Sequence, residues 1–373
     1  MSLVGKVFSN FFHGLSFHLN YKLNKGMFPT FLVYKITMRC NSRCRTCNIW
    51  KTKSFNELKL KDIGYIFNNK FWKNLKYVQL TGGEPFLRTD YPYIVNIFKN
   101  LKKVETIATP SNGFLTNKIV SDVKKSLEII NGKKLFSITI SLDGLEKQHD
   151  YIRRIPNGYK KAVETVKKLK ELEKSYERFT VGIETVISKY NVNNLDEIYN
   201  EFVKLTEHLN FTPAIEAPYF SNTNEEFGIR EKDYDTVIKF YRKIEKDNPS
   251  LSYYYENIIR FFKRGKRTYP CLGLYKTICL GSNGEIYPCV MLDKSLGNAL
   301  KDNLFEIWFS EKTNKLRKSL KTNEFCKTCL NSCDMLNNYN EEFLHFFWFL
   351  LKNPKISYNL FKKTRKGYLR EYV

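Results

Sequence analysis

The feature that most constrains the fold is an alternation of short β-rich runs with longer helical patterns between residues 31 and 216. Residues 159–172, for instance, carry apolar side chains three and four positions apart, as an amphipathic helix does. Strands that alternate with helices indicate βα units around a parallel sheet. Six such units predict an α/β fold with a curved or partly closed, TIM-like (β/α)6 barrel. The runs are 31–37, 77–81, 104–109, 135–141, 180–187 and 211–216.

Short polar motifs follow four of these runs. In parallel barrels, functional residues lie at the carboxyl ends of the strands. "CNSRCRTC" (40–47) follows the first run, and "TGGEP" (81–85) ends the second. "PSNG" (110–113) ends the third run and "SLDG" (141–144) ends the fourth. We therefore expect the functional site at this edge of the sheet.

The composition of the chain changes along its length. After a helical stretch at 233–264, a cysteine-bearing, turn-rich segment begins, in which Asn283-Gly284 predicts a β-hairpin. We expect a small cysteine-rich α+β domain there. The predicted parts are an amphipathic segment at 1–28, the partial barrel at 29–222, a helical connection at 223–266, the cysteine-rich domain at 267–337, and an aromatic and basic helical tail at 338–373.

Nine cysteines is an odd number for a disulfide-bonded protein. Residues 1–20 lack the compact apolar region of a secretory signal. No run reaches the ~20 apolar residues of a membrane-spanning helix. These observations predict a reducing, cytoplasmic setting, where clustered cysteines hold metal or carry out chemistry.

Cys40, Cys44 and Cys47 lie within eight residues, and the next cysteine is Cys271. Structural zinc and iron-sulfur clusters usually take four protein ligands. Three ligands leave one metal position open for a substrate or cofactor. The alternative is a zinc site completed by His149 or by an acidic residue.

The C-x3-C-x2-C pattern after a first barrel strand resembles the radical S-adenosylmethionine (SAM) enzymes. The resemblance implies that Cys40, Cys44 and Cys47 hold a four-iron four-sulfur (4Fe-4S) cluster whose fourth iron binds SAM through its amino and carboxylate groups. It also implies that an electron, supplied by a donor such as ferredoxin or flavodoxin, cleaves SAM. The resulting 5′-deoxyadenosyl radical abstracts hydrogen from the substrate.

Further motifs carry the same resemblance in the same order. "GGEP", "SNG", "SLDGLEKQHDYIRR" (141–154) and "TVISKYNVNNL" (185–195) match family segments at successive strands. The implied SAM-binding residues are Gly82, Gly83, Glu84, Asn112, Ser141 and Arg153. The residue before the third cysteine is often aromatic in the family but is Thr46 here, so Ile49 and Trp50 are both candidates for contacting adenine.

The other cysteines resemble those of SPASM and shorter twitch domains, which hold auxiliary iron-sulfur clusters. A full SPASM domain uses seven cysteines for two clusters, and this chain offers six, so we expect one auxiliary cluster. Cys271 and Cys289 are the expected ligands, with two of the last three cysteines. Cys279 is either a ligand or a buried apolar side chain, and structural zinc is the alternative. The six are Cys271, Cys279, Cys289, Cys326, Cys329 and Cys333.

The resemblance implies a peptide substrate, because SPASM-type members mostly modify peptides. The two chain ends favour a lipid substrate instead. The apolar helical stripe at the N-terminus and the basic aromatic tail at the C-terminus are typical of a peripheral anchor on the anionic inner face of a membrane. Ordinary capping helices are the alternative. The stripe is Val4, Val7, Phe8, Phe11 and Leu15.

The substrate would lie at the mouth of the barrel. The candidates to line this mouth are Glu184, Glu216 and Tyr219, which lie at or after the later strands.

The formal net charge of +24 also fits a zinc-bearing nucleic-acid-binding protein. That reading explains the charge but not the order of the motifs. A radical SAM enzyme that modifies RNA is a further alternative, although the sequence has no recognisable RNA-binding module. We therefore do not expect a nucleic acid partner.

Overall fold

The computed structural model describes residues 3–52, 56–220, 222–223, 225–331, 343–354 and 357. The chain forms two compact units, and each combines stretches that are distant in sequence. The sheet unit comprises Phe28–Arg230 and Lys276–Ser310. The helical unit comprises Met1–Met27, Glu231–Tyr275 and Glu311–Val373. The units are thus interleaved along the chain, whereas the sequence predicted consecutive parts.

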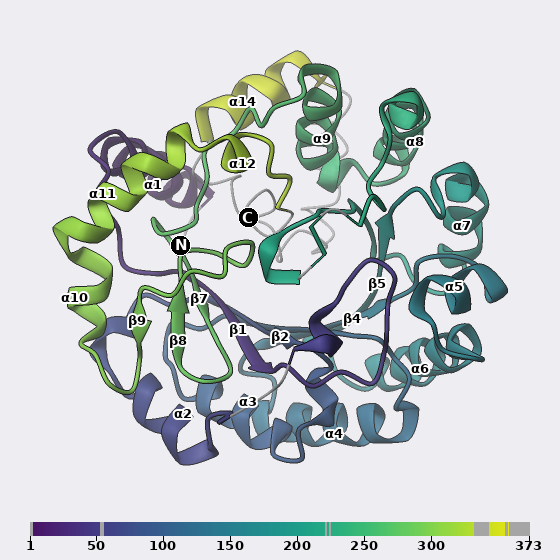
Figure 1. Ribbon diagram of the computed structural model, residues 1–373, viewed down its shortest axis with the longest axis horizontal. Coiled ribbons are helices and arrows are strands. Elements are labelled where there is room, and N and C mark those ends of the chain that lie inside the picture. Colours follow the sequence, from purple (N-terminus) through teal and green to yellow (C-terminus); the bar gives the residue numbers. More distant parts are fainter. Residues whose placement is uncertain are drawn as a thin grey trace. The chain divides into compact units, whose positions relative to one another are not determined.

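Nine strands of the described residues form one sheet, in the order β6-β5-β4-β3-β2-β1-β7-β8-β9 (Figure 1). Neighbouring strands from β1 to β6 are parallel, and β7 adds to the free edge of β1, also in parallel. This order confirms the predicted partial (β/α)6 barrel. The strands are β1 (Phe31–Thr37), β2 (Tyr77–Gly82), β3 (Thr106–Ser111), β4 (Leu135–Ser141), β5 (Phe179–Ile187), β6 (Leu209–Pro213), β7 (Thr277–Leu280), β8 (Glu285–Tyr287) and β9 (Gly297–Asn298).

The hairpin predicted at Asn283-Gly284 is confirmed, because β7 and β8 pair antiparallel around it. Gly284 has φ +89°, a conformation that a residue with a side chain rarely adopts. β7 also pairs with β1, from Phe31↔Thr277 to Tyr34↔Leu280, so the hairpin extends the barrel sheet.

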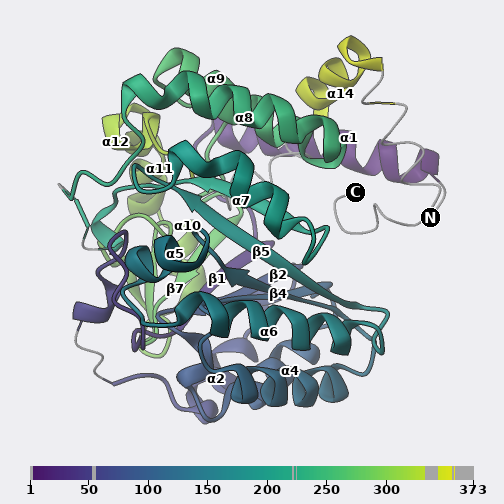
Figure 2. The same cartoon turned by 90° about the vertical axis from the view of Figure 1, so that its right-hand side faces the viewer.

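The two faces of the sheet differ in polarity. In β4, Phe136, Ile138 and Ile140 are buried, whereas Ser137 and Thr139 on the opposite face are partly exposed. Helices cover the apolar face, as Figures 1 and 2 show for α2, α4 and α6. The helices of the sheet unit are α2 (Leu60–Phe67), α3 (Tyr91–Lys99), α4 (Thr116–Ile130), α5 (Glu146–Arg153), α6 (Gly158–Glu173), α7 (Leu195–Phe202) and α10 (Leu304–Phe309), with 3-10 turns η1 (Ile49–Lys51), η2 (Lys70–Trp72), η3 (Pro85–Leu87), η4 (Val192–Asn194) and η5 (Pro218–Phe220).

The helical unit has its own core. Phe17 packs with Leu272 and Tyr275, and the fully buried Arg317 donates a hydrogen bond of 2.7 Å to the Leu274 carbonyl. The helix predicted at 233–264 is interrupted at Pro249, whose ring lacks the N–H that a helix interior needs. Its elements are α1 (Leu3–Lys22), α8 (Tyr234–Asp247), α9 (Ser252–Arg264), α11 (Glu311–Thr322), α12 (Glu324–Lys327) and α14 (Phe343–Lys352), with η6 (Glu231–Asp233) and η7 (Pro249–Leu251).

No helix in the described part of the chain is both long enough and apolar enough to cross a bilayer.

Candidate active site

The three N-terminal cysteines lie on the segment after β1, and we call residues 38–57 the cysteine loop. The Ser42 N–H donates to the Cys40 sulfur at 3.4 Å, and the Ser42 hydroxyl lies 3.0 Å from the Cys44 sulfur. Burial raises the pKa of Cys40 to about 11 and that of Cys47 to about 12. Such thiols become thiolates when a metal centre displaces their protons. Among the described residues, no three His, Cys, Asp or Glu side chains converge as ligands of a single metal ion.

Arg153 places a positive charge beside Cys44. Its Nε lies 2.6 Å from Oδ2 of the buried Asp143, and its guanidinium donates to the Cys44 sulfur at 3.8 Å. Burial alone would lower the pKa of Arg153, but Asp143 and Cys44 raise it above its ordinary value. The guanidinium therefore stays charged, and a nearby cation favours the thiolate form of a cysteine.

The Gly82-Gly83 turn lies against the backbone at the end of β1 and the start of the cysteine loop. Gly83 N–H donates to the Thr37 carbonyl at 2.9 Å, and Glu84 N–H donates to the Arg39 carbonyl at 2.8 Å. A Cβ atom at Gly82 would lie 1.9 Å from the Thr37 oxygen, and one at Gly83 would lie 2.1 Å from the Arg39 oxygen. Gly82 also has φ +126°. Only glycine fits this approach without a backbone shift.

Glu84 and Asn112 connect the ends of β2 and β3 to the cysteine loop. The Glu84 carboxylate is 1% exposed and accepts hydrogen bonds from Ser111 Oγ at 2.9 Å and from Asn112 N at 2.8 Å. A third comes from the Phe86 N–H at 3.2 Å. Burial raises the pKa of Glu84 to about 7, against the effect of these donors. The Asn112 amide donates to Asn41 Oδ1 at 2.7 Å.

The other side of the cysteine loop is also anchored. Arg45 N–H donates to the Ile152 carbonyl of α5 at 2.8 Å. The Asn222 amide, beyond β6, donates to the Thr46 carbonyl at 2.8 Å. The Asn48 N–H donates to the Phe220 carbonyl at 2.9 Å. The loop is therefore held by segments that follow β2, β3, β4 and β6.

The predicted lining residues follow later strands. Ser141 ends β4 and pairs with Glu184 of β5 in the sheet register. The Glu184 carboxylate accepts a hydrogen bond from Thr212 Oγ1 at 3.3 Å, and burial raises the pKa of Glu184. Glu216 follows β6. Tyr219 falls in η5, but its side chain lies outside the described part of the structure.

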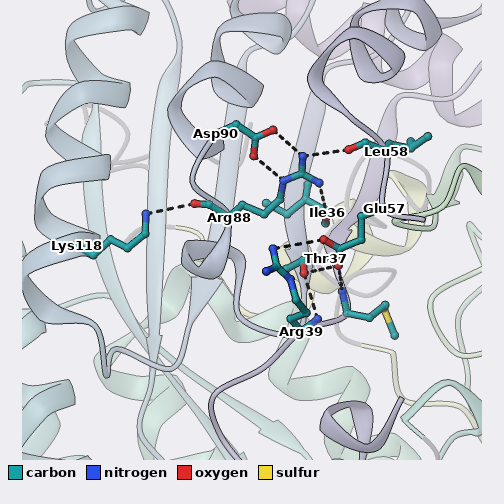
Figure 3. A network of polar contacts seen from close by, with 9 residues as sticks. Ile36, Thr37, Arg39, Glu57, Leu58, Arg88, Asp90 and Lys118 are labelled. Atoms are coloured by element: carbon teal, nitrogen blue, oxygen red, sulfur yellow. Dashed lines mark hydrogen bonds and ion pairs between the residues drawn. The ribbon is translucent and has the colours of Figure 1, made fainter. Parts of the chain in front are cut away.

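Two charged residues missed by sequence reasoning close the base of the cysteine loop (Figure 3). Glu57 accepts hydrogen bonds from Thr37 Oγ1 at 2.6 Å and from the Met38 N–H at 3.1 Å, and it pairs with Arg39 at 3.5 Å. Arg88 is 6% exposed and donates to the Ile36 carbonyl at 2.9 Å and the Leu58 carbonyl at 3.0 Å. Glu57 could have been noticed in the sequence, because it is the first acidic residue of the chain and follows the three cysteines.

We expect Arg88→Met to lower the free energy of unfolding by about 2–4 kcal/mol. The change removes the donor that Arg88 provides to two backbone carbonyls and the partner of Asp90, which lies 2.6 Å from the guanidinium. Urea unfolding of the iron-free protein measures the loss. The control is Lys174→Met, whose pair with Glu171 is exposed and should change stability by less than about 0.5 kcal/mol. Equal stability of the two variants would contradict a clamping role for Arg88.

His149 was an alternative zinc ligand, but its Nδ1 accepts a hydrogen bond of 3.1 Å from the Asp143 N–H. Burial and Arg153 lower the pKa of this fully buried imidazole to about 4, from 6.5.

The lowered pKa of His149 predicts a pH-dependent stability. Between pH 4 and 6.5 the unfolded chain binds more protons than the folded protein does. The free energy of unfolding should therefore fall as the pH falls through that window, by up to about 3 kcal/mol. Urea unfolding across this range should show a slope that His149→Gln reduces. An unchanged slope in the variant would show that His149 is not the group that titrates in this range.

The sheet unit contains Cys279 and Cys289. Cys279 is fully buried on β7, and the nearly buried Lys35 of β1 hydrogen-bonds to it. The Lys35 ammonium also lies 4.8 Å from the centre of the Tyr287 ring. Burial lowers the pKa of Lys35, an effect that Cys279 and Cys289 oppose. A buried cation thus lies beside these two thiols.

The helical unit contains Cys271, Cys326 and Cys329. Burial raises the pKa of Tyr21, and Cys271 and Cys326 raise it further, so both thiols lie near this ring. Cys333 lies outside the described residues. Which cysteines bind an auxiliary cluster therefore stays a prediction.

Two family models match the chain. The model of the radical SAM superfamily matches residues 34–202, and that of the SPASM iron-sulfur cluster-binding domain matches residues 271–330. The first match contains the cysteine loop and the ends of β2, β3 and β4. The second contains the hairpin and the described cysteines beyond residue 270.

Curated relatives include GTP 3′,8-cyclases. The protein of Aquifex aeolicus is 26% identical over 310 residues, which cover 77% of this chain and 91% of that protein. The protein of Aliarcobacter butzleri is 29% identical over 151 residues, which cover 38% of this chain and only 45% of that protein.

Solved structures show the same fold. Streptococcus suis SuiB bound to SAM superposes with a TM-score of 0.60 at 17% identity and covers 84% of this chain and 74% of that chain. The protein anSMEcpe with bound SAM gives a TM-score of 0.59 at 20% identity and covers 88% of this chain and 94% of that chain. Motif order, fold and both family models agree, and the chain belongs to the radical SAM superfamily as an enzyme with a SPASM iron-sulfur domain.

Proposed function

We propose that this enzyme binds SAM at a 4Fe-4S cluster held by Cys40, Cys44 and Cys47, and that it removes a hydrogen atom from a substrate in the barrel. The observation that carries the proposal is the attachment of the cysteine loop to the carboxyl ends of β2 and β3, through the hydrogen bonds of Glu84 to Arg39 and of Asn112 to Asn41. When bound, the cluster supplies the electron that cleaves SAM to methionine and a 5′-deoxyadenosyl radical.

The residues of the chain have distinct roles in this proposal. The Gly82-Gly83 turn fixes the backbone of the cysteine loop, and Arg153 balances the negative charge that Cys44 gains as a ligand. A carboxylate offers about four acceptor positions. Glu84 uses three of them, so it can accept one hydrogen bond from the SAM amino group. Ser141 and Arg153 would contact the SAM carboxylate or ribose, and Ile49 or Trp50 the adenine.

The SPASM domain would bind one auxiliary cluster through Cys271, Cys289 and two of Cys326, Cys329 and Cys333. Lys35 lies beside Cys279 and Cys289, so it supplies a positive charge close to the proposed ligand Cys289. In a cytoplasmic setting, ferredoxin or flavodoxin would supply the electron that reduces the SAM-binding cluster.

A peptide is the first substrate to test. The inner face of the sheet carries hydroxyl and carboxyl groups of Ser137, Thr139, Glu184 and Thr212, which suit a substrate rich in hydrogen-bonding groups. SuiB has been solved with a precursor peptide and anSMEcpe with a peptide, while the curated relatives are named for GTP. GTP and a lipid therefore serve as the comparison substrates.

Anaerobic reconstitution tests the proposal. Iron and sulfide content should exceed that of one cluster, and addition of dithionite and SAM should yield 5′-deoxyadenosine and methionine. A colourless protein that holds only zinc would favour the nucleic-acid-binding alternative instead.

A further inference from the structure

Exposed apolar side chains gather on two helices of the helical unit. On α1 and the residue that follows it, Phe12, Leu15, Leu19 and Leu23 are 61%, 57%, 58% and 53% exposed. On α14, Trp348 and Leu351 are 60% and 56% exposed. Elsewhere among the described residues, the large apolar side chains that are more than half exposed are Tyr65 and Tyr151, whose hydroxyl groups suit water. We call the six residues on the two helices the apolar helix surface.

The α1 helix carries apolar side chains on two faces, one buried and one exposed. Phe17 is fully buried against Leu272 and Tyr275, and the Tyr21 ring lies 4.8 Å from that of Tyr275. Phe12, Leu15, Leu19 and Leu23 follow one another at spacings of three, four and four, which places them on one side of a helix. A surface helix ordinarily carries polar residues on such a face.

The α14 helix lies beside α1, as Figure 2 shows, and the two are in contact. Phe346 and Phe349 pack against Tyr253 of α9, with ring centres 5.5 Å away in both cases. Trp348 and Leu351 are exposed instead. Tryptophan is a residue that prefers the boundary between a membrane and water.

The sequence around the apolar helix surface has more basic than acidic residues. Residues 1–56 contain no Asp or Glu. Lys22 and Lys25 are exposed beside Leu23, and Lys352 is exposed beside Leu351. Residues 341–373 carry five Lys and two Arg against three Glu, although most of them lie outside the described part of the structure. Two copies of such a surface would repel each other, whereas anionic lipid complements it.

We propose that the apolar helix surface docks onto an anionic lipid bilayer, with its leucine side chains among the acyl chains and its lysines at the head groups. This goes beyond the SAM chemistry and does not depend on it. The stripe predicted from the sequence included Val4, Val7, Phe8 and Phe11, whose side chains lie outside the described part. Its last member, Leu15, belongs to the exposed face.

Vesicle flotation of the full chain tests the proposal. The protein should float with vesicles of phosphatidylcholine and phosphatidylglycerol, bind poorly to phosphatidylcholine alone, and be released by salt. Leu19→Glu/Leu23→Glu should lower the bound fraction at least about tenfold, because it removes apolar contact area and adds negative charge. The matched control is Tyr65→Glu/Val203→Glu, which adds the same charge at exposed positions of the sheet unit and should bind normally.

A second readout locates the contact. Brominated lipids should quench the fluorescence of Trp348, and Trp348→Phe should remove that quenching. Unchanged SAM cleavage by Leu19→Glu/Leu23→Glu would show that this variant folds. Equal flotation of that variant and its control would overturn the proposal. A concentration-dependent dimer without vesicle binding would also overturn it, in favour of a second copy as the occupant.

Discussion

Cys40→Ala should lower the rate of reductive SAM cleavage by at least about three orders of magnitude. The change removes one of three thiols from the cysteine loop and leaves the auxiliary cysteines untouched. The variant should therefore retain iron and sulfide equivalent to one cluster while forming almost no 5′-deoxyadenosine. Chromatography of the products and metal analysis of the same sample measure both quantities.

Ser175→Ala is the control, since this exposed serine in the turn after α6 loses a group of similar size. It should retain the wild-type rate. Wild-type cleavage by Cys40→Ala would mean that the cysteine loop does not hold the reactive cluster.

The second large effect is expected at the Gly82-Gly83 turn. Gly82→Ala should lower the free energy of unfolding by about 4 kcal/mol or more, because its Cβ would lie 1.9 Å from the Thr37 oxygen in a backbone conformation with φ +126°. SAM cleavage should fall with it, since any relief of the clash displaces the start of the cysteine loop. Urea unfolding and product formation are the measurements.

Gly64→Ala is its control. Gly64 lies within α2 and no atom would lie within 4 Å of an added Cβ, so this change should raise stability by about 0.5–1 kcal/mol. A loss below about 1 kcal/mol in Gly82→Ala would show that the turn can move away from the loop at little cost.

The strands were predictable where burial is continuous. β1 is buried at every position, and its bounds match the apolar run in the sequence. β3 ends later than predicted, because Pro110 is a typical turn residue but pairs with Thr139 inside the sheet. It also begins two residues later than predicted, at Thr106. The addition of β7 to β1 was not predictable, since that pairing joins residues nearly 250 positions apart and no local pattern indicates which strand covers the free edge of β1.

The site was predictable where motifs are local. The cysteine spacing and the glycine pair can be read directly from the sequence. In the structure, Gly83 lies against Arg39 of the cysteine loop and Asn112 donates a hydrogen bond to Asn41 of that loop. Arg88 was missed because its partners beyond Asp90 are backbone carbonyls, which any residue supplies. Spacing alone does not identify the ligands of the auxiliary cluster. Cys279 is an example, because a fully buried thiol beside Lys35 is compatible both with a cluster ligand and with a buried apolar side chain.

The most direct test is electron paramagnetic resonance of the dithionite-reduced Cys271→Ala/Cys289→Ala variant, which should lack the auxiliary cluster and so isolate the signal of the cysteine loop. Addition of SAM should shift the g values of that signal. A signal that SAM leaves unchanged, or a cysteine loop that binds only zinc, would contradict SAM binding at this cluster.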